Sequence, residues 1–196
     1  MANLDALRTN LEKHGFHTVY FPTAKEAADY LDGKLDARTI GMGGSVTIQQ
    51  MGLMERLAAH NTFYSHWAGA THEQAAGAEV YLCSVNGLAE TGELINIDGT
   101  GNRVASTIYG HKEVYFVVGM NKVAPTYDQA LWRARNIASP KNAQRLGVKT
   151  PCAAKGDKCY DCDSPQRICR ALTVLWRKPN AIPYAEVVLV GEPLGL

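Results

Sequence analysis

The feature that most constrains the fold is a nearly continuous run of β-branched and aromatic residues at 112–118, Lys-Glu-Val-Tyr-Phe-Val-Val. A strand that is apolar on both sides has to be buried on both faces of its sheet, as the inner strands of parallel sheets are. Helical patterns separate this run from most of the other strand-like segments. Those segments lie at 17–21, 38–42, 62–64, 78–85, 94–97, 172–176 and 185–190. The alternation predicts an α/β fold of three layers, with a mostly parallel sheet between two layers of helices.

Length, composition and charge narrow the class of protein. The 196 residues suit a single domain over residues 1–196, and 46% hydrophobic residues are enough for a large core. The net charge of +1 and the lack of a basic block argue against nucleic acid as a partner. No apolar run approaches the roughly 20 residues of a membrane span, and charged residues interrupt the first twelve positions. We therefore expect a cytoplasmic protein, in which disulfides are disfavoured.

A glycine-rich turn at 40–45, Ile-Gly-Met-Gly-Gly-Ser, connects a predicted strand to a predicted helix. Gly43 and Gly44 would let the backbone approach a ligand closely, and the amides and the Ser45 hydroxyl would favour an anion. The alternative is a tight turn in which Ser45 only caps the helix. The loop at 66–69 could reach the same pocket, because ligands of parallel sheets bind beyond the carboxyl ends of the strands.

Two further loops, at 86–93 and 96–103, carry charged residues among glycines. Glu90 and Asp98 could act as a nucleophile or general base, and Arg103 could hold an anionic substrate. The alternative is a β-hairpin whose turn residues simply face water. We predict that these three residues join the glycine turn around one polar anion pocket.

Four of the five cysteines fall within eighteen residues, in the pattern C-x6-C-x2-C-x6-C. They are Cys152, Cys159, Cys162 and Cys169, in a segment at 150–170. The segment could hold a metal or cluster, form disulfides or act as a redox switch. We predict a four-thiolate metal site, either a 4Fe-4S cluster or zinc, because the spacing does not separate the two. The alternative is a set of reduced, unligated thiols. The fifth cysteine, Cys83, lies on an apolar strand and is predicted to be a small buried hydrophobe.

Taken together, these motifs resemble the LUD-domain family, which is named for lactate utilisation. The similarity lies in Gly41–Ser45, Ala89–Glu93, Asp98–Arg103 and Val117–Val123, within residues 1–146. It implies a fold like that of the sugar-phosphate isomerase and class I CoA-transferase group (NagB/RpiA/CoA-transferase-like). It also implies a cytoplasmic protein that acts beside iron–sulfur oxidoreductases in lactate oxidation.

The segment Thr150–Cys169 resembles the tail of a short-form subgroup of that family. The leading hypothesis is therefore an iron–sulfur protein of the LUD type in cytoplasmic redox metabolism of a small carboxylate, with lactate as a candidate. The expected partners are a small anionic substrate, other iron–sulfur oxidoreductase subunits and a second copy paired through an edge strand at 184–190. Two alternatives stay open. One is a CoA-transferase-like enzyme, because Glu90-Thr-Gly92 is similar to the Glu-x-Gly around the nucleophile of class I CoA-transferases. The other is a non-catalytic domain that a structural zinc holds together.

Overall fold

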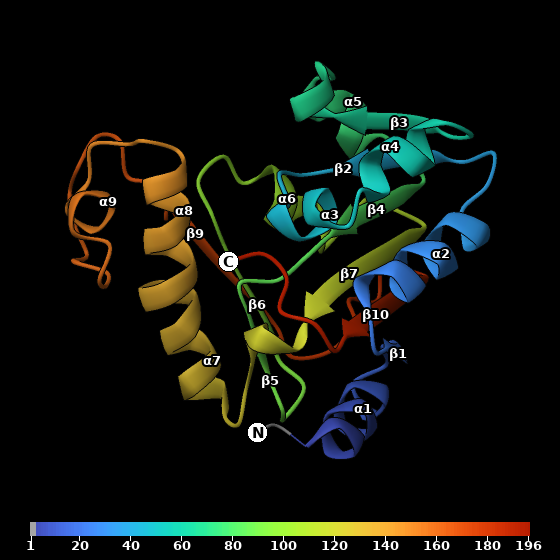
Figure 1. Ribbon diagram of the computed structural model, residues 1–196, viewed down its shortest axis with the longest axis horizontal. Coiled ribbons are helices and arrows are strands. Elements are labelled where there is room, and N and C mark those ends of the chain that lie inside the picture. The colour runs from blue at the N-terminus through green and yellow to red at the C-terminus, as the bar shows by residue number, and fades with distance from the viewer. Residues whose placement is uncertain (1–2) are drawn as a thin grey trace.

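The computed structural model describes residues 3–196 and is built around a six-stranded sheet in which all neighbouring strands run parallel (Figure 1). In spatial order the strands are β1 (His17–Phe21), β10 (Tyr184–Val190), β7 (Glu113–Gly119), β4 (Val80–Cys83), β2 (Thr39–Met42) and β3 (Thr62–Ser65). β7 lies inside the sheet, and its residues after Glu113 are all buried. The predicted α/β fold with a mostly parallel sheet is confirmed.

Alternate residues of β7 point into two separate hydrophobic cores, one on each face of the large sheet. Tyr115 and Val117 pack in the core beneath three helices, whereas Val114 and Phe116 pack in the core beneath a single helix. The three helices are α2 (Ala24–Lys34), α3 (Val46–Gln50) and α4 (Leu53–Ala58), and the single helix is α1 (Leu4–Lys13). The sheet is thus the middle of three layers, as the alternation of apolar residues requires.

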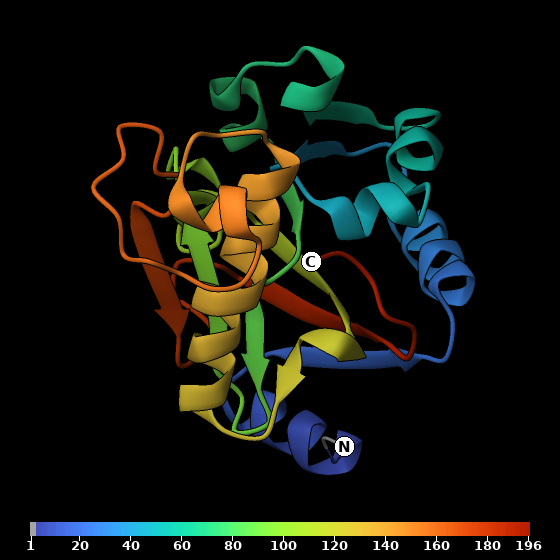
Figure 2. The same cartoon turned by 60° about the vertical axis from the view of Figure 1, so that its left-hand side comes forward.

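A second, four-stranded sheet shares the α1 side of the molecule. Its order is β8 (Val123–Ala124), β5 (Gly87–Ala89), β6 (Leu94–Asp98) and β9 (Ala171–Leu175). β6 runs antiparallel to both of its neighbours, so β5 and β6 form a hairpin. One face of this sheet joins the α1 core, and the other packs against α7 (Tyr127–Arg133). Figure 2 shows α7 and the helix that continues it crossing in front of the strands.

The long helix over the small sheet is continuous through a proline. After α7 come a π-helical turn, Ala134–Ala138, and then α8 (Ser139–Arg145). Pro140 has no amide hydrogen to donate, whereas both the amide and the hydroxyl of Ser139 donate to the carbonyl oxygen of Ala134. A π turn accommodates one extra residue per turn and is a frequent feature of functional sites. Here it turns residues 135, 136 and 139 towards the cysteine segment.

Two expectations about elements need correction. The single helix predicted after the glycine-rich turn is divided into α3 and α4, because Gly52 adopts a left-handed conformation with φ of +62°. The strand at 184–190 is not an edge strand: β10 lies between β1 and β7 and pairs with both. Subunit pairing through that strand is therefore excluded, because both of its hydrogen-bonding edges are occupied.

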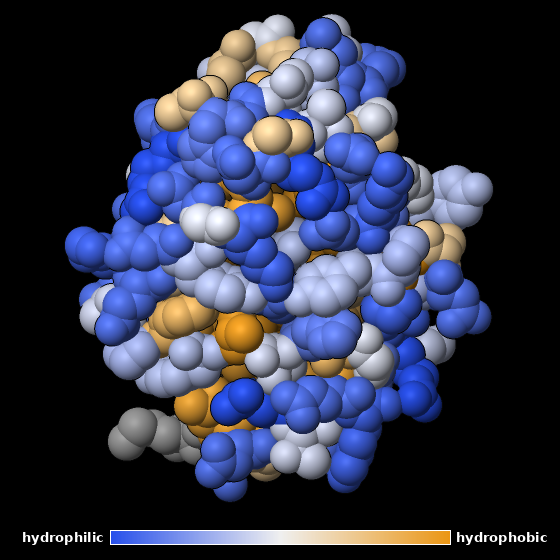
Figure 3. Space-filling view, turned by 90° about the vertical axis from the view of Figure 1, so that its right-hand side faces the viewer, coloured by the Kyte–Doolittle hydropathy of each residue, from blue (hydrophilic) through white to orange (hydrophobic). Residues whose placement is uncertain are grey.

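The remaining elements are short: α5 (His72–Ala76), α6 (Asn102–Ser106), α9 (Pro151–Lys155) and the 3-10 turns His66–Ala68 and Met120–Lys122. Among residues 3–196, no helix has the length and apolarity needed to traverse a bilayer. The face on the α2 side is mainly hydrophilic, and its apolar side chains show only in small separate areas (Figure 3).

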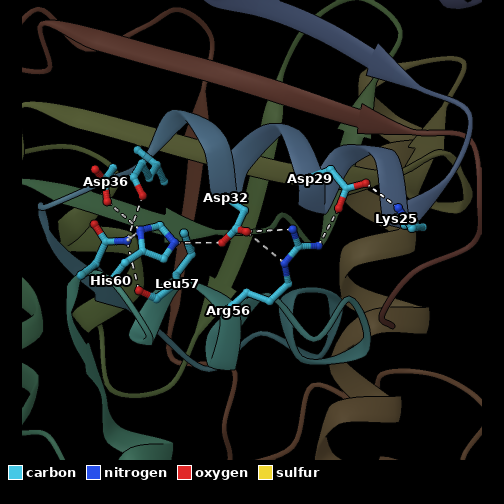
Figure 4. Close-up of polar contacts among 9 residues, drawn as sticks. Lys25, Asp29, Asp32, Asp36, Arg56, Leu57 and His60 are labelled. Atoms are coloured by element: carbon cyan, nitrogen blue, oxygen red, sulfur yellow. Dashed lines mark hydrogen bonds and ion pairs between the residues drawn. The ribbon is translucent and has the colours of Figure 1, made fainter.

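A polar network joins α2 to α4 and the loop that follows it (Figure 4). Arg56 contacts Asp29 and Asp32 at 2.8 Å each, and the His60 ring lies 3.0 Å from Asp32 and 2.9 Å from Asp36. The two carboxylates raise the pKa of His60 through these hydrogen bonds. The network ties the outer helices together at a solvent-facing position, far from the carboxyl ends of β4 and β7.

Candidate functional site

A polar cavity of about 350 Å³ lies beyond the carboxyl ends of β2, β4 and β7. Loops that follow several strands contribute to it, together with residues of α8 and the end of the chain at Leu196. This is where the topology of a parallel sheet predicts a ligand. Its charged and histidine side chains are His66, His72, Asp98, Arg103, Lys122 and Arg145.

Lys122 is the least exposed of these groups, with only 3% of its surface accessible. It ends the 3-10 turn that follows β7, and its ammonium nitrogen donates to the hydroxyl oxygens of Thr47 (2.7 Å) and Ser84 (2.9 Å). Burial, together with the nearby cations Arg133 and Arg103, lowers the pKa of Lys122 to about 7. Near neutral pH the amine is therefore balanced between its charged and neutral forms.

Arg103 presents a second cation to the cavity. One of its terminal nitrogens donates to Asn86 Oδ1 at 3.0 Å and to the carbonyl oxygen of Ile97. Arg145 adds a third cation, which lies over the ring of Trp67 at 5.6 Å. Within residues 3–196, none of Lys122, Arg103 and Arg145 has a carboxylate within ion-pair distance. Because Asp98 is the one carboxylate side chain that the described residues contribute to the lining, the side chains of the cavity carry a net positive charge.

Asp98 lines the cavity, but its oxygens are already engaged. Oδ1 accepts from the amide of Thr100 at 3.2 Å, and Oδ2 accepts from the amides of Arg103 and Val104 at 3.1 and 3.2 Å. Three backbone donors on one carboxylate are the pattern of a helix N-terminal cap. The geometry assigns Asp98 to holding α6, and with it Arg103, in place.

Two histidines stand at the rim on the β3 side. The rings of His66 and His72 lie 5.2 Å apart, and His66 is also in edge contact with Trp67. Burial lowers the pKa of His66, and the neighbouring His72 lowers it further. The loop at 66–69 thus does reach the pocket, as the sequence suggested it could.

Residues of the glycine-rich turn line the cavity and also pack closely against aromatic side chains. A Cβ at Gly44 would lie 3.1 Å from Trp67, and a Cβ at Gly43 would lie 2.7 Å from the Tyr81 hydroxyl. Gly44 and Ser45 line the cavity, whereas Gly43 lies behind it against Tyr81. The Ser45 hydroxyl accepts from the amide of Ile48 and so caps α3.

Glu90 lies outside this cavity, so the expectation that it lines the same pocket is corrected. It follows β5 at the opposite end of the hairpin, where its carboxylate accepts from the amide of Asn3 at 2.6 Å. The Asn10 side chain donates to the Glu90 carbonyl oxygen at 2.8 Å. Because β5 runs antiparallel to β6, the turn that holds Glu90 lies away from the loop that holds Asp98 and Arg103. Of the three predicted catalytic residues, the fold brings only Asp98 and Arg103 together.

The four clustered cysteines line one small space of about 10 Å³, together with residues of the π turn and α8. All four are free thiols and half-buried, whereas Cys83 is fully buried in the core, as predicted. Within residues 3–196, no three His, Cys, Asp or Glu side chains are arranged to hold a single metal ion. A tetrahedral zinc would need sulfur atoms about 3.8 Å apart, given Zn–S distances near 2.3 Å. Four thiolates are also the donor set of an iron–sulfur cluster.

The loop Cys159–Cys162 has a local geometry that suits sulfur ligands. Asp161 adopts a left-handed conformation with φ of +45°, and its amide donates to the Cys159 sulfur at 3.3 Å. Amide hydrogen bonds to sulfur are among the groups that tune iron–sulfur centres. The amide of Cys159 in turn donates to the Asn136 side chain of the π turn at 3.2 Å.

Arg167 organises the rest of the cysteine segment. Its guanidinium donates to the carbonyl oxygens of Cys162 (2.9 Å) and Cys169 (2.8 Å), and to Asp161 at 2.9 Å. Arg135 approaches the same Asp161 oxygen at 3.4 Å. Two arginines around one carboxylate leave a net positive charge beside the four thiols, which favours an anionic thiolate centre.

The cysteine space and the polar cavity are neighbours. Ser139 and Ile168 line both of them. A further cavity of about 300 Å³ is lined by Cys159, Cys169, Ile97 and Ser139, and so contacts both sites as well. In Figure 1, α9 and the cysteine loop lie against α8, the helix that also supplies Arg145 to the polar cavity.

With the fold and the two sites described, the sequence and the fold can be compared with those of known proteins. The chain belongs to the LUD domain family, whose profile matches residues 4–190. The fold is similar to the 1.70 Å crystal structure of a DUF162 family protein from Deinococcus radiodurans. That likeness has a TM-score of 0.58 at 15% identity and covers 96% of each chain. No curated protein matches the sequence.

Sequence reasoning singled out Arg103 and the cysteines, but it missed Lys122, Thr47 and Ser84. The one sequence feature that could have indicated Lys122 is its position, three residues after the end of the most apolar strand of the chain. A lysine in a loop usually faces water, and only the fold shows that this one is buried between two hydroxyl groups.

Proposed function

We propose that the protein is an iron–sulfur protein that binds a small carboxylate in the Lys122 cavity and acts in cytoplasmic redox metabolism of that carboxylate. Lactate is the candidate that the family relationship suggests, with other iron–sulfur oxidoreductase subunits as partners. One observation carries the proposal: the four thiols converge beside a cationic cavity with which they share Ser139 and Ile168. A redox centre next to a substrate site is the arrangement that electron transfer requires.

In this proposal Cys152, Cys159, Cys162 and Cys169 hold the cluster, which supplies one-electron chemistry when bound. The chain's own residues bind and orient the substrate. Arg103 is held in place by Asn86 and the Ile97 carbonyl, which leaves the rest of its guanidinium fork for a carboxylate. A carboxylate beside Lys122 would favour the ammonium form, so binding of the anion would be accompanied by uptake of a proton.

The cluster is tested by anaerobic purification followed by iron and acid-labile sulfide assays. We expect both elements in the wild-type protein and their loss in Cys162→Ala. Cys83→Ala is the matched control, because Cys83 is a free thiol that is buried in the core and does not line the space between the other four. Colourless wild-type protein without iron and sulfide, or with stoichiometric zinc instead, would contradict the proposal.

Carboxylate binding is tested by calorimetric titration with acetate and lactate. We expect Arg103→Gln to weaken both by about tenfold or more, since a charge-assisted hydrogen bond contributes roughly 1.5–3 kcal/mol. Arg177→Gln is the control, because Arg177 is exposed and donates to a backbone carbonyl at the far end of the molecule. Equal affinities in the two variants would remove Arg103 from the binding site.

A further inference from the structure

Lys122 is a buried amine whose polar neighbours are hydroxyl groups. Thr47 approaches it from α3 and Ser84 from the end of β4, and the two hydroxyls are also 3.3 Å from each other. The charged side chains nearby are Arg133 from α7 and Arg103 from α6, both of the same sign as the ammonium group. Leu196, which lines the same cavity, accepts from Arg133 at 3.3 Å. Burial raises the pKa of the neighbouring Cys83 thiol to about 12, so it stays neutral. Within residues 3–196, no carboxylate side chain pairs with the Lys122 ammonium, whose side chain reaches a cavity open to ligands.

The loop between β4 and β5 holds the amine and Arg103 near each other. Ser84 contacts Lys122, and Asn86, two residues further on, contacts Arg103. Two residues of chain span at most about 7 Å. A small ligand whose carboxylate binds the guanidinium can therefore reach the amine with its adjacent carbon atom.

We propose that Lys122 is a nucleophilic amine that forms an imine with the carbonyl carbon of a small 2-oxo acid whose carboxylate binds Arg103. A 2-oxo acid carries the two required groups, a carboxylate and a carbonyl, on adjacent carbon atoms. The inference rests on the carboxylate site of the proposed function and adds a substrate class and a covalent step to it.

The step is a condensation that neither oxidises nor reduces the substrate. The lone pair of the neutral Nζ attacks the carbonyl carbon, and the carbonyl oxygen takes up a proton to give a carbinolamine. The nitrogen gives up two protons in turn, the first to the former carbonyl oxygen and the second to the hydroxyl group, which leaves as water as the C=N bond forms. The hydroxyls of Thr47 and Ser84 lie within hydrogen-bond distance of Nζ and can accept and return these protons. Because burial lowers the pKa of Lys122 to about 7, the neutral nucleophile is present at neutral pH, where exposed lysines are almost fully protonated.

The test is reductive trapping of the full-length protein at pH 7 with pyruvate and cyanoborohydride, followed by intact mass measurement and peptide mapping. We expect one reduced pyruvyl group per chain, located on Lys122. Lys122→Met should lose it, and Lys25→Met should keep it, because the Lys25 side chain is 83% exposed. Mapping on the wild-type protein decides the question even if the Lys122 variant folds poorly.

Two results would overturn the inference: no adduct on folded wild-type protein, or adducts spread over exposed lysines with none preferred. Acetate titration of the same sample separates this failure from that of the proposed function. Acetate binding without a pyruvyl adduct would refute the imine and leave the carboxylate site in place. Arg103→Gln should reduce the trapping rate with pyruvate at least tenfold, whereas an equal rate would show that Arg103 does not position the 2-oxo acid.

Discussion

Replacing Lys122 by methionine should stabilise the protein at neutral pH, because the buried ammonium has no compensating charge. Methionine has a similar length and no charge to desolvate. The two hydroxyls that lose the amine, on Thr47 and Ser84, can still hydrogen-bond to each other. The pKa of Lys122 falls from 10.5 to about 7 on folding, so the unfolded chain binds more protons than the folded one between those two values. The stability of the wild-type protein should therefore rise with pH across that window.

The size of the effect follows from proton linkage. A lysine with these two pKa values destabilises the folded state by about 4 kcal/mol at pH 7 and by about 1 kcal/mol at pH 9.5. Lys122→Met removes this penalty, so its stability advantage should shrink by about 3 kcal/mol between the two pH values. Relaxation of the site would reduce the figure but not change its sign.

The assay is urea unfolding of both proteins at pH 7.0 and pH 9.5, under reducing conditions and without carboxylates in the buffer. Taking the difference between variants cancels the titration of all other groups. A variant that is less stable than the wild type at pH 7, or an advantage that is the same at both pH values, would refute the assignment of a desolvated, unpaired lysine.

Three further predictions concern groups near or away from the cavity. His60→Gln should lower the melting temperature more at pH 5.5 than at pH 8.5. The pKa of His60 is higher in the folded protein than its unfolded value of 6.5, so the charged ring stabilises the fold below pH 6.5 and this contribution is lost as the pH rises through the folded pKa. An equal decrease in melting temperature at both pH values would contradict the charged network. Asp98→Ala should cost about 1–2 kcal/mol in urea unfolding through loss of the α6 cap, and an unchanged midpoint would disprove the capping role. Glu90→Gln should leave acetate affinity in calorimetry within about twofold of wild type, because Glu90 contacts Asn3 outside the cavity. A tenfold loss would place Glu90 in the site after all.

Much of the large sheet could be predicted from the sequence, because its signals are local. The 112–118 run forms β7, and Thr23 caps α2 in a capping box, a local sequence pattern in which the Glu26 carboxylate accepts from the Thr23 amide. The small sheet could not be predicted in the same way. Its strands β5 and β8 have three and two residues, and their pairing depends on contacts between distant parts of the chain.

Residues of the candidate site could be predicted only where both the residue type and its position in the sequence are unusual for a loop. Four cysteines with close spacing predict convergence by themselves, and Arg103 lies in a loop after a predicted strand. Lys122 and Ser84 carry no such signal, because a lysine and a serine after strands are ordinary loop residues until burial is known. Glu90 was predicted to line the cavity because it lies among glycines. In the antiparallel hairpin of β5 and β6, however, Glu90 lies at the end opposite to Asp98 and Arg103.

The measurement that tests the central claim most directly is X-ray absorption at the iron edge on anaerobically purified protein. We predict iron bound by sulfur with iron neighbours at short range, a signal that disappears in Cys162→Ala and persists in Cys83→Ala. Protein without iron, or iron bound only by oxygen and nitrogen, would contradict a cluster held by the four cysteines beside the Lys122 cavity.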